Sequence, residues 1–123
     1  RVDFREHLER LCDDLDGAVA ACLMGADGLP VEAVERFQDE GGLDANSLFV
    51  EYSSLLPQIR QSAEMFTAGD VQELCIRSAG LTAIIRPVTD EYFLALALRP
   101  DGNLGKGRYL LRLVAPPLVD ELS

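Results

Sequence analysis

Apolar residues in the first part of the chain follow the period of an amphipathic helix. They recur at four- and three-residue steps, which places them on one face of a helix. These residues are Phe4, Leu8, Leu11 and Leu15. Asp3 lies three residues before Glu6, the spacing of a capping box with aspartate in the cap role, and Gly17 can end the helix. The pattern therefore predicts a helix over residues 2–16.

Two further segments have helical spacing, and both contain prolines. A second helix is predicted over residues 44–66, beginning at a group of residues that can cap it. Pro57 lies inside this pattern, so we expect a kink or a local break there and not the end of the helix. A last helix is predicted over residues 105–122. Pro116-Pro117 should interrupt it and leave a short tail at residues 118–122.

Five shorter segments predict β-strands. Residues 17–25 are small and apolar and are bounded by glycines, which favours a strand buried on both faces. Asp27-Gly28 predicts a tight hairpin into residues 31–37, whose mixed polar pattern is typical of an edge strand, and residues 38–44 should form a loop. Three more runs follow at residues 71–79, 81–89 and 91–99. Tight corners separate these runs, which predicts antiparallel pairing.

The last of these runs sorts its side chains by face. One face would carry Tyr92, Leu94, Leu96 and Leu98, and the other Phe93, Ala95 and Ala97. Because both faces are apolar, we expect a central strand with helices on both sides. The fold class predicted is α/β (α+β), a five-stranded antiparallel sheet between two helical layers in the order α-β-β-α-β-β-β-α. We expect residues 1–123 to form one domain.

The chain is strongly acidic, with a formal net charge of −10. Phosphate backbones and anionic membranes attract basic surfaces, so we expect neither a nucleic-acid partner nor a membrane partner. No apolar run is long enough to span a bilayer, and residues 1–9 lack the apolar block of a signal peptide. We expect a cytoplasmic protein that favours partners with basic faces.

Residues able to carry chemistry are few and scattered. Cys12, Cys22 and Cys75 are widely spaced, which disfavours a disulfide framework or a zinc site. The only histidine, His7, lies on an acidic stretch of the first predicted helix, with no second metal ligand nearby in the sequence. We therefore expect no catalytic residue, no cofactor and no metal.

The glycine-rich residues 102–107 follow a predicted strand and precede a helix, as phosphate-binding loops do. A P-loop needs a glycine where this chain has Pro100, and a serine or threonine where it has Gly107. We therefore interpret the segment as a loop that lets the last helix dock against the sheet.

Surplus apolar surface is the most informative feature. The second predicted helix carries more large apolar residues than one stripe needs, and residues 71–79 offer a poorly protected sheet edge. A helix with exposed apolar residues beside an unpaired strand edge favours a symmetric dimer. The alternative is that the surplus apolar residues are buried in the monomer core. The interface residues that we expect are Leu48, Tyr52, Leu55, Leu56, Ile59, Leu74 and Ile76.

The order and spacing of several short motifs resemble the Roadblock family. They are Gly17-Ala18-Val19-Ala20, the Asp27-Gly28 hairpin, residues 92–98, and Asp101-Gly102-Asn103-Leu104-Gly105 with Arg108 entering the final helix. The resemblance covers nearly the whole chain and implies a Roadblock/profilin-like arrangement of the predicted sheet. Val50-Glu51-Tyr52 and residues 105–109 look most like the MglC-like members of the bacterial Mgl group, with MglB-like members as the related alternative.

The resemblance implies a non-catalytic homodimer with a continuous ten-stranded sheet. It also implies a role in a polarity and gliding-motility switch built around an MglA-type Ras-like GTPase, in the cytoplasm and enriched at a cell pole. MglC-like members contact an MglB-like paralogue and a RomR-like response regulator. Partner contacts are expected at the first hairpin turn, on Ala26, Asp27 and Leu29, although related chains often have a larger residue in place of Ala26.

Two other functions stay open beside the adaptor. MglB-like members bind the GTPase directly and accelerate hydrolysis without donating an arginine finger, so a GTPase-activating subunit is the main alternative. A small-molecule sensor is the third. It is least favoured because the apolar runs contain no polar cluster to line a ligand pocket.

Overall fold

The computed structural model describes residues 3–36 and 43–122, and its elements follow the order α-β-β-α-α-β-β-β-α. The helices are α1 (Phe4–Asp13), α2 (Ala45–Ser53), α3 (Leu56–Met65) and α4 (Leu104–Leu122). The strands are β1 (Ala18–Gly25), β2 (Pro30–Glu35), β3 (Leu74–Arg77), β4 (Thr82–Pro87) and β5 (Tyr92–Leu98). The predicted strand end at residue 37 and most of the loop predicted at residues 38–44 lie outside the described residues.

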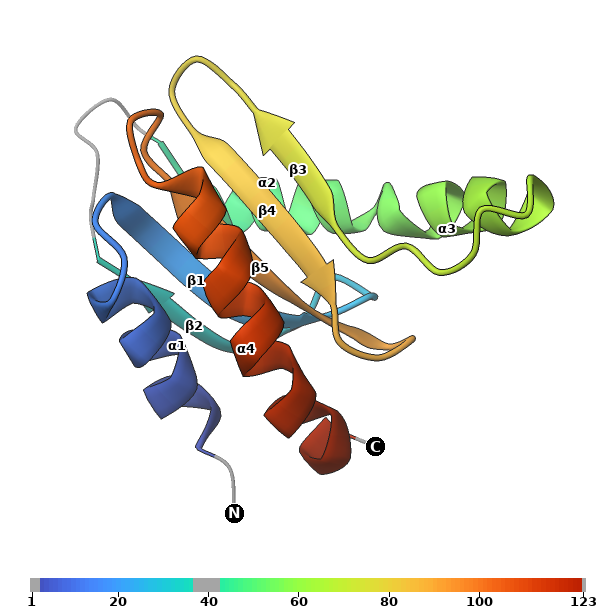
Figure 1. The fold of residues 1–123 in the computed structure, drawn as a ribbon, viewed down its shortest axis with the longest axis horizontal. Coiled ribbons are helices and arrows are strands. Elements are labelled where there is room, and N and C mark those ends of the chain that lie inside the picture. Colours follow the sequence, from blue (N-terminus) through green and yellow to red (C-terminus); the bar gives the residue numbers. More distant parts are fainter. Residues whose placement is uncertain (1–2, 37–42, 123) are drawn as a thin grey trace.

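The five strands form one antiparallel sheet in the order β2-β1-β5-β4-β3 (Figure 1). β5 lies at its centre, between β1 and β4, and β2 is an edge strand, as predicted. β3 forms the other edge and is shorter than the predicted residues 71–79. The antiparallel sheet between helical layers is therefore confirmed, with one more helix than the sequence predicted.

Side chains of β5 divide between two cores, as their alternation predicted. Leu94, Leu96 and Leu98 pack under α1 and α4 on one face. Phe93, Ala95 and Ala97 pack on the other face, where α2 contributes Phe49. Asp3 caps α1, because its Oδ1 accepts a hydrogen bond from the backbone N–H of Glu6 at 3.2 Å.

A break separates α2 from α3 just before Pro57. The proline ring would clash with the carbonyl of Ser53, four residues earlier, so a continuous helix is disfavoured. Pro57 lies in the first turn of α3, where its missing N–H costs little. The hydroxyl groups of Ser53 and Ser54 donate 2.6 Å hydrogen bonds to the carbonyls of Val50 and Glu51 at the end of α2. The expected local break is confirmed, and α3 projects beyond β3 (Figure 1).

The last helix runs through its two prolines, contrary to the prediction of a short tail. α4 continues to Leu122 with Pro116 and Pro117 inside it. Each proline leaves a carbonyl without its helical donor, but these carbonyls belong to exposed residues that water can reach. Leu118 is buried against the α1 core. Burial of this side chain holds the last turns in place, which local propensity alone does not reveal.

Candidate functional site

The arm formed by α2 and α3 exposes several large apolar side chains. Phe66, directly after α3, is 78% exposed, Met65 is 66% exposed and Leu55, between the helices, is 45% exposed. These residues lie at the two ends of α3, and exposed apolar surface of this kind is typical of a protein-binding surface. We call Leu55, Ile59, Met65 and Phe66 the arm surface.

The structure divides the seven residues predicted for a dimer interface. Leu55 is exposed, and five others are half-buried: Leu48, Tyr52, Ile59, Leu74 and Ile76. Leu56 is fully buried beside Phe49 in the core on the alanine side of β5. Leu56 is therefore not available for the expected interface. For this residue the alternative holds, namely that the surplus apolar side chain is buried in the monomer core. Met65 and Phe66 were not among the interface residues expected from the sequence. Two large apolar residues at the end of a predicted helix could have indicated exposed apolar surface there.

The open edge of β3 lies beside the arm. β3 pairs with β4 from Leu74 opposite Ile85 to Arg77 opposite Thr82, and within the described residues no strand pairs with its other side. Leu74 packs toward the α2 core, whereas Cys75 points to the α4 side and is exposed. The strand has no lysine, proline or bulge to block pairing, so its backbone groups are available to another strand.

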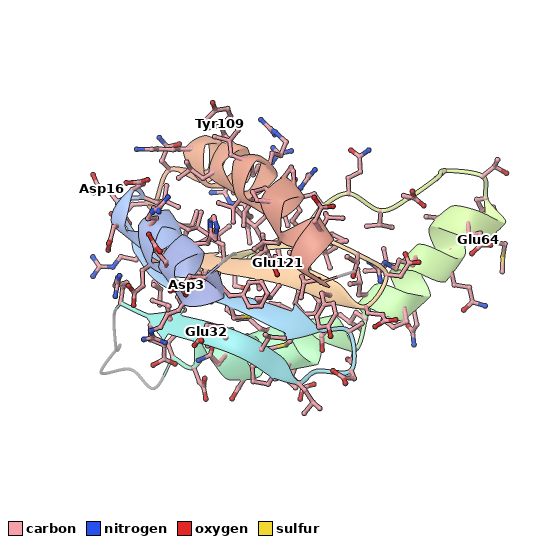
Figure 2. The ribbon with its side chains drawn as sticks, turned by 90° about the horizontal axis from the view of Figure 1, so that it is seen from below. Asp3, Asp16, Glu32, Glu64, Tyr109 and Glu121 are labelled. Carbon is pink, nitrogen blue, oxygen red and sulfur yellow. The ribbon has the colours of Figure 1, made fainter. Side chains whose placement is uncertain are left out.

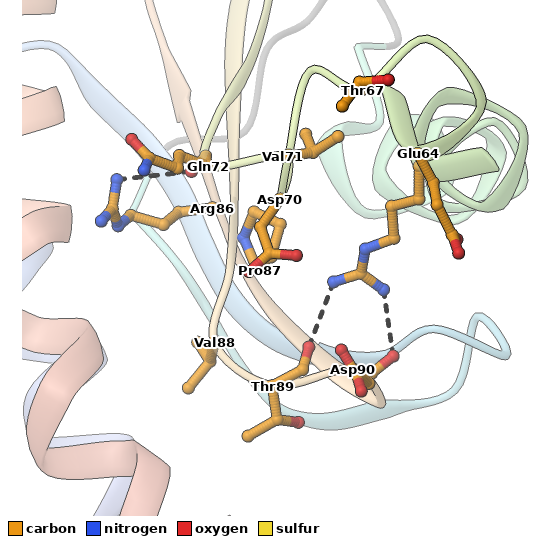
Figure 3. Close-up of a pocket in the computed structure, with 12 residues that line it drawn as sticks. Glu64, Thr67, Asp70, Val71, Gln72, Arg86, Pro87, Val88, Thr89 and Asp90 are labelled. Carbon is orange, nitrogen blue, oxygen red and sulfur yellow. Dashed lines mark hydrogen bonds between the residues drawn. The ribbon is translucent and has the colours of Figure 1, made fainter. Parts of the chain in front are cut away.

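A groove of about 670 Å³ lies between α3 and the turn joining β4 to β5 (Figure 3). The Arg60 guanidinium spans it and donates hydrogen bonds to the carbonyls of Thr89 at 3.1 Å and Asp90 at 3.0 Å. These bonds fix the direction of α3 relative to the sheet. The groove also carries the carboxylates of Glu64, Asp70 and Asp90. It joins segments far apart in the sequence, so no local motif could have indicated it.

The predicted partner residues meet on one turn. Asp27 Oδ1 accepts a hydrogen bond from the backbone N–H of Leu29 at 3.0 Å, and Gly28 has a φ of 87°, which suits glycine. The backbone N–H of Ala26 donates to the carbonyl of Glu91 at 2.8 Å, tying this turn to the β4–β5 turn. Leu29 is 67% exposed beside a depression of about 420 Å³ that also includes Tyr92. The turn is rigid and presents an apolar tip with an acidic neighbour.

The cysteine, histidine and carboxylate side chains of the described residues are candidate metal ligands and nucleophiles. Among these residues, no three histidine, cysteine or carboxylate side chains come close enough to hold a metal ion. Burial raises the pKa of Cys12 to about 11 and that of Cys22 to about 12, so both remain thiols at neutral pH. No helix in this part of the chain has the length and hydropathy needed to cross a membrane.

Comparisons with known proteins place the chain among Roadblock domains. The crystal structure of MglC from Myxococcus xanthus is 42% identical, with a TM-score of 0.67, and the match covers 96% of this chain and 98% of that one. MglB from Myxococcus xanthus is 15% identical with a TM-score of 0.81, covering 97% and 94% of the two chains. A Roadblock/LC7 domain from Streptomyces avermitilis is 16% identical with a TM-score of 0.82, covering 98% of both. The last two likenesses concern the fold alone. A comparison with curated proteins gave no match.

The family resemblance seen in the sequence is confirmed by a match over most of its length. The sequence model of the Roadblock/LC7 domain covers residues 5–98, which include α1 except for its first residue and all five strands. With the MglC structure similar over nearly the whole chain, this protein belongs to the Roadblock/LC7 domain family.

Proposed function

We propose that this chain is a non-catalytic Roadblock adaptor of one domain that acts as a homodimer in the cytoplasm. In this proposal it regulates a switch built around an MglA-type Ras-like GTPase by binding an MglB-like paralogue and a RomR-like response regulator, with enrichment at a cell pole. The exposed arm surface beside the open edge of β3 is the observation that carries the proposal. The 42% identity to MglC supports the choice of an MglC-like role.

The position of the arm supports the proposed dimer. Because α3 projects past β3, a second copy that pairs with β3 would also meet the arm surface. Removing a large apolar side chain from water contributes about 1.5–3 kcal/mol, and association costs about 4–15 kcal/mol. Burying the exposed parts of Leu55, Met65 and Phe66 from both copies would contribute roughly 6–11 kcal/mol, which falls within the range of that cost, and strand pairing would add to it. Two copies of a five-stranded sheet would then form one sheet of ten strands.

The dimer is tested by reversing the polarity of one exposed residue. Phe66→Glu should convert a dimer to a monomer, measured by light scattering coupled to size-exclusion chromatography. Leu113→Glu on α4 is the matched control, because Leu113 is also exposed and the charge change is the same. A Phe66→Glu protein that keeps the wild-type mass would remove the dimer assignment.

The first hairpin turn is proposed as the contact with an MglB-like paralogue. Leu29 supplies the apolar tip, and Asp27 and Ala26 shape the turn. Leu29→Arg should abolish co-elution with a purified MglB protein and leave the homodimer intact. Equal binding by wild type and Leu29→Arg would place the contact elsewhere on the chain.

The GTPase-activating alternative has weaker support, since the likeness to MglB is one of fold alone. It requires faster GTP hydrolysis when this chain is mixed with an MglA-type GTPase in the absence of MglB. The adaptor requires no change in that rate, and an altered rate only when MglB is present. A single hydrolysis assay with and without MglB therefore separates the two functions.

A further inference from the structure

Charge is unevenly distributed along this acidic chain. Residues 74–119 hold six of the eleven basic residues but only three of the twenty-one acidic ones. This region is therefore locally cationic in a protein whose net charge is −10. It contains β3, β4, β5 and most of α4.

Three of these six basic residues, Lys106, Arg108 and Arg112, lie at exposed positions of α4. The inward face is buried through Gly107, Leu111, Ala115 and Leu118. The outward face carries Lys106, Tyr109, Arg112 and Leu113, all exposed, and Tyr109 points away from the sheet (Figure 2). The Arg112 guanidinium carbon lies 5.9 Å from the centre of the Tyr109 ring, so the charge is held beside the aromatic face.

The cations on this face differ in how they are paired. Arg108 is bound to Glu73 by contacts of 2.8 and 2.9 Å, which link α4 to the segment before β3. Arg77 lies on the same side of the sheet as Cys75 and α4, because side chains alternate along a strand. Within the described residues, no carboxylate lies in ion-pair distance of Arg77, Lys106 or Arg112.

Apolar groups lie among these cations. Tyr109 and Leu113 are 52% and 53% exposed and lie one helical turn apart. Leu113 also lines a groove of about 260 Å³ between α1 and α4, whose α4 side is apolar and whose α1 side includes Arg10, Leu11 and Asp14. This arrangement provides a recess for an apolar side chain next to unpaired positive charge.

We propose that the outward face of α4, centred on Tyr109, Arg112 and Leu113, binds an acidic, apolar-striped helix of a partner protein. Apolar residues spaced by four on that helix would contact Tyr109 and Leu113 and enter the α1–α4 groove. Carboxylates flanking them would pair with Arg112 and Lys106. α4 and α2 cover opposite faces of the sheet (Figure 1), and the α4 residues are not part of the arm surface, so the site does not depend on the proposed dimer.

Charge decides between the occupants that such a face could take. A second copy is already placed on the arm surface and the β3 edge in the proposed dimer, and a further copy on this charged face would add the repulsion between chains of net charge −10. An anionic membrane would meet the acidic end of α4, where Asp120 and Glu121 lie. A narrow acidic helix avoids both conflicts, because its carboxylates meet Lys106 and Arg112 while only its apolar side chains reach the groove beside α1.

The site is tested with a synthetic 18-residue helical peptide. The peptide carries leucines four residues apart, flanked by glutamates, and a matched peptide has lysine in place of every glutamate. Fluorescence anisotropy should show binding of the acidic peptide only. Arg112→Glu should weaken that binding at least tenfold, and Tyr109→Ala should weaken it without changing the net charge. Arg36→Glu, beyond the end of β2 at the opposite edge of the sheet, makes the same charge change as Arg112→Glu; it also removes the surface ion pair between Arg36 and Asp13, and it should leave binding unchanged.

Four results would overturn the proposal. They are equal binding of both peptides, equal binding by wild type and Arg112→Glu, no binding of the acidic peptide, and binding to phosphatidylserine vesicles in its place. The Phe66→Glu variant distinguishes this site from the dimer. Light scattering should show that the variant is a monomer, and anisotropy should show that it still binds the peptide. Circular dichroism of each variant confirms that it remains folded.

Discussion

Gly107 determines how closely α4 approaches the sheet, and replacing it with alanine is a direct test of the packing. A Cβ at this position would lie 3.2 Å from Leu96 Cδ2, 3.3 Å from Leu98 Cδ1 and 3.4 Å from Leu15 Cδ2. All three leucines are buried, so none can move away into solvent. Gly105, two residues earlier in the same helix, is exposed and has only Asn103 Oδ1 nearby, at 3.7 Å. The two glycines therefore form a matched pair.

Two effects of opposite sign decide the outcome at Gly107. Alanine in place of glycine favours a helix by up to about 1 kcal/mol. Forcing an extra methyl group into a packed core costs about 1–3 kcal/mol. We therefore expect Gly107→Ala to lower the free energy of unfolding by about 0–2 kcal/mol. Gly105→Ala carries only the favourable effect and should be neutral or stabilising.

Urea unfolding followed by circular dichroism measures both variants against wild type. The expected order of midpoints is Gly105→Ala at or above wild type and Gly107→Ala below Gly105→Ala. Gly107→Leu should shift the midpoint further in the same direction, because its side chain is much larger. If the urea midpoint of Gly107→Ala matched or exceeded that of Gly105→Ala, the inference that α4 packs in close contact with β5 would be wrong.

Three further predictions follow from burial and hydrogen bonding. Phe49→Ala should lower the free energy of unfolding by about 3–5 kcal/mol in the same urea assay, because this side chain of α2 is fully buried against the sheet. Arg60→Met should speed amide hydrogen exchange in α3 but not in α1, since it removes the two hydrogen bonds to the β4–β5 turn. Cys75 should react with a maleimide in the native state, whereas Cys12 and Cys22 should react only after unfolding, because both are buried and burial raises the pKa of both thiols.

Strand β5 shows why much of the fold could be predicted from the sequence. Side chains of a strand alternate between two faces, so an alternating pattern directly identifies what each face packs against. The leucine face and the alanine face were both assigned correctly for this reason. The helix break at Pro57 was predictable on equally local grounds, since a proline ring acts on the carbonyl four residues before it.

Features that depend on distant contacts could not be predicted in this way. The two prolines of α4 carry a local penalty, but burial of Leu118 keeps the helix continuous. Likewise, Leu56 belongs to the same apolar pattern as Leu55, and only the packed structure shows that one is buried and the other exposed. The arm's direction depends on Arg60 reaching Thr89 and Asp90. A pattern identifies apolar residues, whereas the assembled core decides which of them remain for a partner.

The two faces of the sheet offer binding surfaces of different physical character. The arm surface is apolar, so association through it depends mainly on burial and changes little when salt is added. Salt even favours it slightly, because screening reduces the repulsion between two chains of charge −10. The outward face of α4 attracts a partner through exposed charge, and at 0.1 M salt such attraction is screened beyond about 10 Å. The same change in salt should therefore move the two proposed associations in opposite directions, which would let one chain keep its own copy while it exchanges an acidic partner.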